Sequence, residues 1–425
     1  MTADPVALTI AARSKRTHAR LGRVDTPHGG FDTPAFMPVG TRGTVKGILP
    51  EQVRQGGAQI LLNNTYHLML RPGSELIEQL GGVHAFMGWD APILTDSGGF
   101  QAYSMADINA VDDDGVRFKS IVDGSTVHLG PESAMRVQNE LGADIIMAFD
   151  DCPPAVDPSA APDNLARLRQ ASIRPKDYDH DARLRIANER TIRWLDRCKR
   201  AHAKPSDQAL FGIVQGGTDH EHRRWSLERV CNIDLPGYAI GGVAVGESSE
   251  QIAEIVQLVG PKLPESKPRY LMGVGYERDL LSAVLGGVDM FDCVLPTRNG
   301  RNASAFTATG SIRLKNAKFR EDPGPIDPAC DCQACTPAAH GWQTPDGKPF
   351  SRGYIRHLFL AGEMLGPILV SLHNLRHFQR FMLDVRGAIE NDAWQDLAAK
   401  WPVIAPVLGS AVDRFGEPLL SPARP

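Results

Sequence analysis

An acid, Asp292, interrupts the short apolar run 288–295 near its carboxyl end. The turn-rich segment that follows, residues 297–320, holds six Lys or Arg residues, among them Arg298 and Arg301, and no Asp or Glu. A carboxylate beside a cationic segment suits a site that binds a polyanion and carries out chemistry on it. The alternative is that Asp292 caps a turn and the arginines form a solvated face.

Two further apolar runs end in acids. Asp96 is followed by Ser97 and then Gly98-Gly99, where the absence of side chains lets backbone amides approach a ligand. Asp150 could accept two parallel hydrogen bonds from a flat edge such as N1–H and N2–H of guanine. The alternatives are a turn or helix cap for Asp96, and a calcium- or magnesium-binding pair formed by Asp150 and its neighbour Asp151.

Other residues could recognise a flat base. Gln215, which precedes two glycines, and the backbone amides near Gly242 could donate hydrogen bonds to a carbonyl such as guanine O6. Phe100 and Met272 could sandwich the ring, although both residue types are also common in ordinary cores. The pattern therefore extends from catalysis to recognition of a purine-like ring.

A separate group of thiols has the pattern C-x-C-x-x-C, formed by Cys330, Cys332 and Cys335. Three thiolates so close together suit a tetrahedral soft-ligand ion, and Zn²⁺ is the usual one. The histidines that could supply the fourth ligand are His340, His357, His373 and His377. His373 is favoured because it lies in an apolar segment that reads as a helix. A closed four-ligand site is expected to be structural.

Composition limits the class of protein. Of 425 residues, 42% are hydrophobic and 23% charged, as in an ordinary globular protein. A net charge of −4 means that any RNA contact must come from a local basic patch. Seven cysteines, mostly isolated, do not form a disulfide framework, and neither a signal peptide nor a membrane-spanning run is evident. A cytoplasmic protein is expected.

Eight short apolar runs alternate with segments of helical periodicity. They cover residues 34–40, 59–67, 92–100, 144–152, 209–217, 237–247, 268–275 and 290–297. Continuous apolar runs between amphipathic helices indicate parallel strands buried on both faces. Eight such units predict an α/β fold of the (β/α)8 TIM-barrel type. Reactive groups of such barrels gather at the carboxyl ends of the strands, where the acids described above lie.

The barrel pattern is interrupted. We expect a barrel core with an N-terminal β-hairpin in residues 1–302, an inserted zinc-binding subdomain in 303–378, and a helical segment completing the barrel in 379–425. Residues 115–130 alternate around a turn and predict a projecting hairpin. Residues 153–208, polar and rich in arginine, predict a helical excursion before the fifth strand.

Nine motifs together resemble the bacterial tRNA-guanine transglycosylases. They are NNTYHLMLRPG (63–73), TDSGGFQ (95–101), FDDC (149–152), FGIVQGG (211–217), IGGVAVGE (240–247), YLMGVG (270–275), DMFDCVLPTRNGRN (289–302), CDCQAC (330–335) and SLHNLR (371–376). The resemblance implies a barrel with an inserted zinc subdomain and, in queuosine biosynthesis, exchange of the wobble guanine of GUN-anticodon tRNAs for preQ1. It also implies a homodimer.

The resemblance also implies roles. Asp292 matches the nucleophile and Asp96 the general acid/base, which is coherent because glycosidic exchange with retention needs two displacements and a carboxyl that changes its protonation state. The residues matched to base recognition and stacking are Asp150, Gln215, Gly242, Val243, Phe100 and Met272. Cys152 and Val245 resemble the bacterial rather than the eukaryotic pocket. The basic segment with Arg298 and Arg301 would hold neighbouring nucleotides of the anticodon loop.

Two other classes of protein share parts of this pattern. A non-catalytic tRNA-binding subunit has no need of three strand-end acids, Asp96, Asp150 and Asp292. A metal-dependent barrel hydrolase does not explain thiolates set apart from those acids. The chain also departs from the family: Tyr276 stands where bacterial relatives usually carry Lys, and residues 336–349 read as an additional surface loop.

Overall fold

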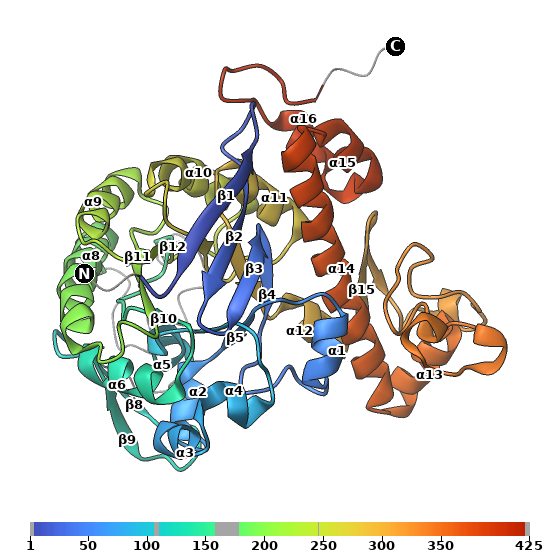
Figure 1. Ribbon diagram of the computed structural model, residues 1–425, viewed down its shortest axis with the longest axis horizontal. Helices are drawn as coiled ribbons and strands as arrows, with labels where there is room; N and C mark the ends of the chain where they lie inside the picture. Colours follow the sequence, from blue (N-terminus) through green and yellow to red (C-terminus); the bar gives the residue numbers. More distant parts are fainter. Residues whose placement is uncertain (1–3, 106–109, 158–177, 245, 421–425) are drawn as a thin grey trace.

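A closed barrel of parallel strands forms the centre of the protein. The computed structural model describes residues 4–105, 110–157, 178–244 and 246–420. The barrel strands are β4 (Ala35–Pro38), β5 (Leu61–Asn63), β6 (Ile93–Thr95), β10 (Ile145–Met147), β11 (Ala209–Val214), β12 (Gly237–Ile240), β13 (Arg269–Leu271) and β14 (Met290–Cys293). They pair in the order β4-β14-β13-β12-β11-β10-β6-β5, and a parallel bridge between Val39 and Leu62 closes the ring (Figure 1). The predicted (β/α)8 TIM barrel is confirmed.

Both faces of the strands are buried, which explains their continuous apolar sequences. In β10, Ile145 and Met147 belong to the core inside the barrel, whereas Ile146 belongs to the core between the strands and the helices. Alternate side chains of a strand point to opposite faces. A strand enclosed on both sides therefore has apolar residues at most of its positions.

Helices surround the barrel. They are α1 (Pro50–Gln55), α2 (Thr65–Leu70), α3 (Ser74–Gln79), α4 (Gly82–Met87), α5 (Gly99–Met105), α6 (Pro131–Leu141), α8 (His180–Ala201), α9 (His220–Cys231), α10 (Ser249–Val259), α11 (Glu277–Leu285), α12 (Leu295–Arg301), α13 (Arg352–Ala361), α14 (Leu365–Asn391), α15 (Trp394–Lys400) and α16 (Ala405–Ser410). Local sequence starts several of them; in α10, for example, Ser248 and Gln251 form a reciprocal capping box. Of the described helices, none combines the length and apolar character needed to cross a membrane.

An antiparallel sheet lies at the amino-terminal end of the barrel. It consists of β1 (Ala7–Arg13), β2 (Arg20–Thr26) and β3 (Gly29–Thr33). The predicted hairpin corresponds to β2 and β3, and β1 is an additional strand. The sequence does not reveal β1 because its side chains alternate between exposed and half-buried positions. Val24 and Phe31 are buried in the core inside the barrel, so this sheet plugs that end.

Two excursions leave the barrel wall. The hairpin predicted in residues 115–130 is present as β8 (Val116–Lys119) and β9 (Thr126–Leu129). A short strand, β7 (Ala110–Val111), pairs with β8 as a third strand of this sheet. The helical excursion predicted in residues 153–208 contains α8. Residues 158–177 of that excursion lie outside the described part of the chain.

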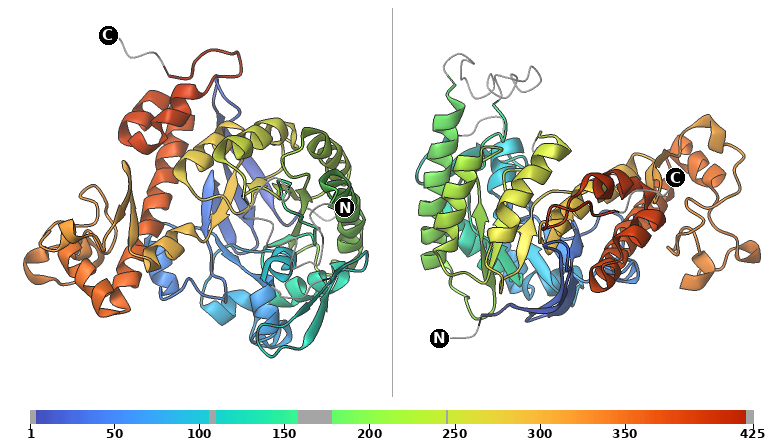
Figure 2. Two further views of the ribbon diagram at one scale, coloured as in Figure 1. Left: turned by 180° about the vertical axis from the view of Figure 1, so that it is seen from behind. Right: turned by 90° about the horizontal axis from the view of Figure 1, so that it is seen from above.

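The region after β14 projects from the barrel. It contains the hairpin β15 (Ser304–Thr307) and β16 (Gly310–Arg313), several 3₁₀ turns, and α13. Figures 1 and 2 show α14 between this region and the barrel, in contact with both. The boundary predicted at 378/379 falls within α14, so this one helix serves both parts. The division of the chain into three units stays a prediction.

Candidate active site and metal centre

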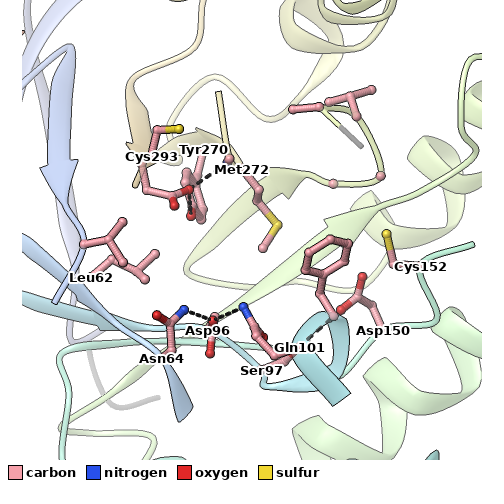
Figure 3. A pocket seen from close by; sticks show the side chains of 18 of the residues that line it. Leu62, Asn64, Asp96, Ser97, Gln101, Asp150, Cys152, Tyr270, Met272 and Cys293 are labelled. Carbon is pink, nitrogen blue, oxygen red and sulfur yellow. Dashed lines mark hydrogen bonds between the residues drawn. The ribbon is translucent and has the colours of Figure 1, made fainter. Parts of the chain in front are cut away.

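A cavity of about 210 Å³ opens at the carboxyl ends of the barrel strands. Every residue predicted for catalysis or base binding lines it: Asp96, Phe100, Asp150, Gln215, Gly242, Val243, Met272 and Asp292. These residues come from six different strands or their following loops, and barrel closure brings them together. Figure 3 shows Asp96 on one wall of the cavity and Tyr270, Met272 and Cys293 on the opposite wall.

Asp292 is held by the neighbouring strand. Its Oδ1 accepts a hydrogen bond from the Tyr270 hydroxyl at 2.5 Å and another from the Gly273 amide at 2.8 Å. Its Oδ2 has no hydrogen-bond partner among the described residues, so this oxygen can approach a ligand. Burial raises the pKa of Asp292, while the bonds from Tyr270 and Gly273 oppose that rise. One carboxylate oxygen is thus fixed and the other is available for attack.

Asp96 lies at the end of β6 within a cluster of donors. Its carboxylate accepts hydrogen bonds from Asn64 Nδ2 at 2.5 Å, the Thr65 amide at 2.8 Å and Gln101 Nε2 at 2.9 Å. The predicted alternative of a helix cap is met in part, since Thr65 is the first residue of α2. Burial, with a contribution from the charge of Asp292, raises the pKa of Asp96 to about 6. A carboxyl with that pKa can serve as acid and as base near neutral pH.

Asp150 and Gln215 form the next part of the cavity. Gln215 Nε2 donates to Asp150 Oδ2 at 2.5 Å, and Gln215 Oε1 is buried without a partner in the described part of the chain. Burial, and then the charge of Asp151, raises the pKa of Asp150 to about 6. In this arrangement Gln215 already donates to Asp150. The amide nitrogen of Gln215 carries two hydrogens, so a second N–H remains for a base carbonyl.

Asp151 turns away from the cavity. Its oxygens accept hydrogen bonds from Arg183 at 2.5 and 3.0 Å and from Arg190 at 2.6 Å, both on α8. Two guanidiniums neutralise the buried carboxylate, and they tie the loop after β10 to the helix. The geometry gives no support to a calcium- or magnesium-binding pair of Asp150 and Asp151. It also gives α8 a structural role beside the cavity.

Arg223 is a fully buried residue that sequence reasoning missed. Its guanidinium donates to the carbonyls of Gly217 at 2.7 Å, Val214 at 2.8 Å and Gly242 at 3.0 Å. These carbonyls flank Gln215 and include the backbone of Gly242. Burial lowers the pKa of Arg223 to about 10, so the side chain stays charged at neutral pH. Nothing in the spacing of the sequence distinguished this arginine from those at the surface.

Glycine is required at position 242. Its φ of +62° is unfavourable for other residues, and an added Cβ would lie 2.1 Å from Gln215 Oε1. Phe100 is 42% exposed and Met272 half-buried, so both present apolar surface to the cavity. Cys152 lines the same cavity, whereas Val245 lies outside the described residues.

The basic segment lies beyond the cavity. Residues 295–301, expected to be turn-rich, form the helix α12, which begins at Leu295 and has Pro296 in its first turn, where no amide hydrogen is needed. Arg298 is exposed and Arg301 half-buried, and neither lines the cavity. Within the described residues, no carboxylate forms an ion pair with any Lys or Arg of 297–320. These cations are therefore available to an external anion.

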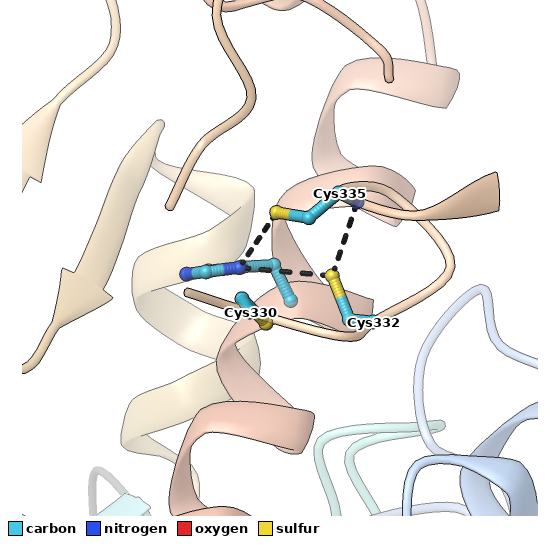
Figure 4. A group of neighbouring side chains, drawn as sticks. Cys330, Cys332 and Cys335 are labelled. Carbon is cyan, nitrogen blue, oxygen red and sulfur yellow. Dashed lines mark hydrogen bonds between the residues drawn. The ribbon is translucent and has the colours of Figure 1, made fainter. Parts of the chain in front are cut away.

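The three thiols and His373 form one buried cluster, with ligand atoms all within 4.8 Å of one another (Figure 4). His373 Nδ1 lies 3.5 Å from Cys335 Sγ and 3.7 Å from Cys332 Sγ. His373 Nε2 lies 2.7 Å from the carbonyl oxygen of Phe306, which can only accept a hydrogen bond. Nε2 therefore carries the proton and Nδ1 presents its lone pair to the thiols. The cluster could hold a metal ion, and its donor set fits a zinc site.

The other three histidines are directed elsewhere. His340 Nε2 contacts the carbonyl of Asp331 at the surface, and His357 is exposed on α13. His377 Nε2 lies 2.6 Å from Glu277 Oε1, with both side chains buried. His373 alone among the four joins the cluster.

The fold and cavity place this protein among the TIM-barrel enzymes, with three acids, Asp96, Asp150 and Asp292, at the carboxyl ends of the strands. Comparison with known families identifies the group more narrowly. The family model described as queuine tRNA-ribosyltransferase matches residues 14–403, and the chain belongs to this family. It is accordingly an enzyme, a pentosyltransferase.

Relatives resemble the chain over nearly their whole length. A queuine tRNA-ribosyltransferase of Halothermothrix orenii is 48% identical over 388 residues, which cover 91% of this chain and 95% of that protein. One from Acetivibrio thermocellus is 49% identical over 387 residues, covering 91% and 94%. One from Thermus thermophilus is 49% identical over 398 residues, covering 94% of each.

Proposed function

We propose that this protein exchanges the guanine at wobble position 34 of GUN-anticodon tRNAs for preQ1, in the biosynthesis of queuosine. The observation that carries the proposal is the pairing of Asp292 and Asp96 in one cavity. Asp292 has an available oxygen, and Asp96 has a pKa of about 6. A nucleophile and a group that gives and takes a proton are the two parts that base exchange requires.

The reaction proceeds by two displacements. Asp292 Oδ2 attacks C1′ of the ribose, forming an ester-like bond as the bond from C1′ to guanine N9 breaks. Asp96 gives its proton to the departing guanine. Asp96 then accepts the N9 proton of preQ1, whose nitrogen attacks C1′ and displaces Asp292. Two inversions restore the original configuration at C1′.

Base recognition follows from the rest of the cavity. The target base must leave its stack to reach Asp292, at an expense of a few kcal/mol. Asp150 accepts hydrogen bonds from the edge of the base, Gln215 and the Gly242 region donate to its carbonyl, and the carbonyl of Val243 accepts one from the aminomethyl group of preQ1. Phe100 and Met272 enclose the ring.

The remaining assignments concern binding and assembly. Arg298 and Arg301 contact phosphates of the anticodon loop, since among the described residues no carboxylate forms an ion pair with either of them. Zn²⁺ is the ion suited to Cys330, Cys332, Cys335 and His373, and it would stabilise the region between β15 and α14 without taking part in the reaction. The family resemblance further favours a homodimer that acts in the cytoplasm.

Exchange of labelled guanine into unmodified tRNA tests the proposal. Incorporation into a GUN-anticodon tRNA, and its displacement by preQ1, is the expected result. Binding of tRNA without incorporation would instead indicate a non-catalytic subunit. Release of guanine without incorporation of a new base would indicate a hydrolase.

A further inference from the structure

Tyr276 is a large aromatic residue that remains 45% exposed close to the catalytic cavity. The chain leaves β13 at Leu271, lines the cavity with Met272 and Gly273, and reaches Tyr276 three residues later. Gly273 donates its amide hydrogen to Asp292 at 2.8 Å, so this short segment also holds the proposed nucleophile. The ring is thus connected to the reacting centre by a few residues of backbone.

The segment before Tyr276 packs tightly against the end of the neighbouring strand β14. A Cβ added to Gly275 would lie 2.6 Å from Cys293 Sγ, and Cys293 lines the cavity. Because Gly275 has no side chain, the backbone can lie directly on Cys293 at this point. Tyr276 consequently lies where β13 and β14 meet, beside the start of α12.

Contacts with neighbouring residues hold the Tyr276 ring in place. Phe306 meets it edge-on, with ring centroids 6.3 Å apart and an angle of 69° between the planes. Tyr276 is also the N-cap residue of α11, and the next residue, Glu277, is anchored by a buried contact of 2.6 Å with His377. The aromatic surface is therefore presented to solvent from a rigid base.

One cation lies against this exposed ring, and another is exposed on the helix that follows β14. The Arg278 guanidinium lies 5.5 Å from the ring centroid of Tyr276. Arg298 is exposed on α12, which starts two residues after Cys293. An aromatic face combined with unpaired or exposed cations is typical of surfaces that bind single-stranded nucleic acid, where bases stack and phosphates pair with the charges.

We propose that Tyr276 is a stacking platform for an unpaired nucleobase that neighbours the exchanged nucleotide in the anticodon loop. This inference rests on the proposed function. Extrusion of the target base into the cavity deprives its neighbour of a stacking partner. The ring of Tyr276, fixed at the cavity edge, restores a partner for that neighbour and so favours the extruded state. Stacking on an aromatic ring tolerates any base, because every base has a π face.

The test uses the full-length protein and an anticodon stem-loop RNA, with affinity measured over a range of salt concentrations. Tyr276→Ala should weaken binding about five- to hundredfold, while the slope of log affinity against log salt stays that of wild type. Tyr276→Phe keeps the ring and should bind as wild type does. Phe415→Ala, which removes an exposed ring that also carries an arginine at 5.0 Å but whose neighbours Asp413 and Arg414 line a different pocket, is the matched control.

A second measurement identifies the stacked base. RNA carrying 2-aminopurine in place of one neighbour of the wobble nucleotide should lose fluorescence on binding wild type and Tyr276→Phe, at one of the two neighbouring positions. That quenching should be absent with Tyr276→Ala. Equal affinity of Tyr276→Ala and wild type, quenching that persists in Tyr276→Ala, or a loss in Tyr276→Phe as large as in Tyr276→Ala would each overturn the inference.

The two proposals can fail separately. If wild type exchanges guanine and Tyr276→Ala binds RNA equally well, the stacking platform is wrong and the proposed function stands. If wild type neither binds the stem-loop nor exchanges guanine, both are wrong.

Discussion

The Tyr270 hydroxyl donates a hydrogen bond to Asp292 Oδ1 at 2.5 Å, across the boundary between β13 and β14. The two strands are parallel neighbours, and Tyr270 pairs with Met290, two residues before Asp292. This contact orients the carboxylate and stabilises its ionised form, so it connects the register of the barrel with the reactivity of the proposed nucleophile.

Removing the Tyr270 hydroxyl should make Asp292 harder to ionise. Tyr270→Phe keeps the ring but withdraws the donor, so the pKa of Asp292, already raised by burial, should rise further. The acidic limb of the pH–rate profile for base exchange should move to higher pH, with a lower rate at its plateau. An acidic limb unchanged in Tyr270→Phe would show that this bond does not tune the nucleophile.

Asp292 should form a covalent bond to the ribose. Asp292→Asn keeps the shape of the side chain but removes the attacking anion. Exchange should therefore fall by roughly 10³-fold or more, while tRNA affinity stays close to that of wild type. With a base analogue that cannot complete the second displacement, wild type should give an enzyme–RNA adduct on a denaturing gel and Asp292→Asn should give none. An adduct that persists in Asp292→Asn but is missing in Asp96→Asn would transfer the nucleophilic role to Asp96.

The buried charge of Asp150 should destabilise the protein above pH 6. Its pKa is about 6 in the folded state against 3.8 for an ordinary aspartate, so between these values the folded state binds more protons than the unfolded state. The free energy of unfolding should consequently decrease as pH rises from about 4 to 6. Asp150→Asn should be more stable than wild type at pH 8, by on the order of 1–3 kcal/mol, and equal to it near pH 4. Thermal unfolding of both proteins should be measured from about pH 4 to pH 8. A difference in stability between Asp150→Asn and wild type that did not depend on pH would contradict the raised pKa of Asp150.

Loss of one thiolate should release the metal ion. Cys332→Ser should purify without stoichiometric zinc, measured by elemental analysis. It should also lose about 4 kcal/mol of stability, the value for a ligand present at a thousand times its Kd. Cys231→Ser, which removes a thiol outside the cluster, is the control and should keep both its zinc and the stability of wild type. A Cys332→Ser protein that retains zinc and melts like wild type would exclude a structural metal site at this cluster.

RNA affinity should depend on local charge because the whole protein is acidic. Arg298→Ala and Arg301→Ala should each weaken tRNA binding and reduce the slope of log affinity against log salt by about 0.7–0.9, the contribution of one phosphate contact. Arg136→Ala, an exposed arginine on α6 already paired with Glu140, should leave the slope unchanged. Equal slopes for all these proteins would remove α12 from the RNA interface.

Sequence alone determined the features whose signal is local. Eight continuous apolar runs identified all eight barrel strands, because a strand buried on both faces is apolar at most of its positions. The short C-x-C-x-x-C spacing located the cluster that could hold a metal ion, since three soft ligands within six residues have few other uses. Residues that end barrel strands share one face of the barrel, and this identified the acids of the cavity.

Tertiary structure decided which polar groups meet. The donors around Asp96, the orientation of Asp151 toward α8 and the position of Arg223 beneath Gln215 depend on contacts between distant segments, and such contacts leave no periodic pattern. The sequence also failed to predict β1, because its side chains are exposed or only half-buried. For α12, packing against α14 makes a helix of a segment that its Pro, Asn and Gly residues mark as a turn. Burial and pairing of polar side chains are properties of the closed barrel, and only the folded chain specifies them.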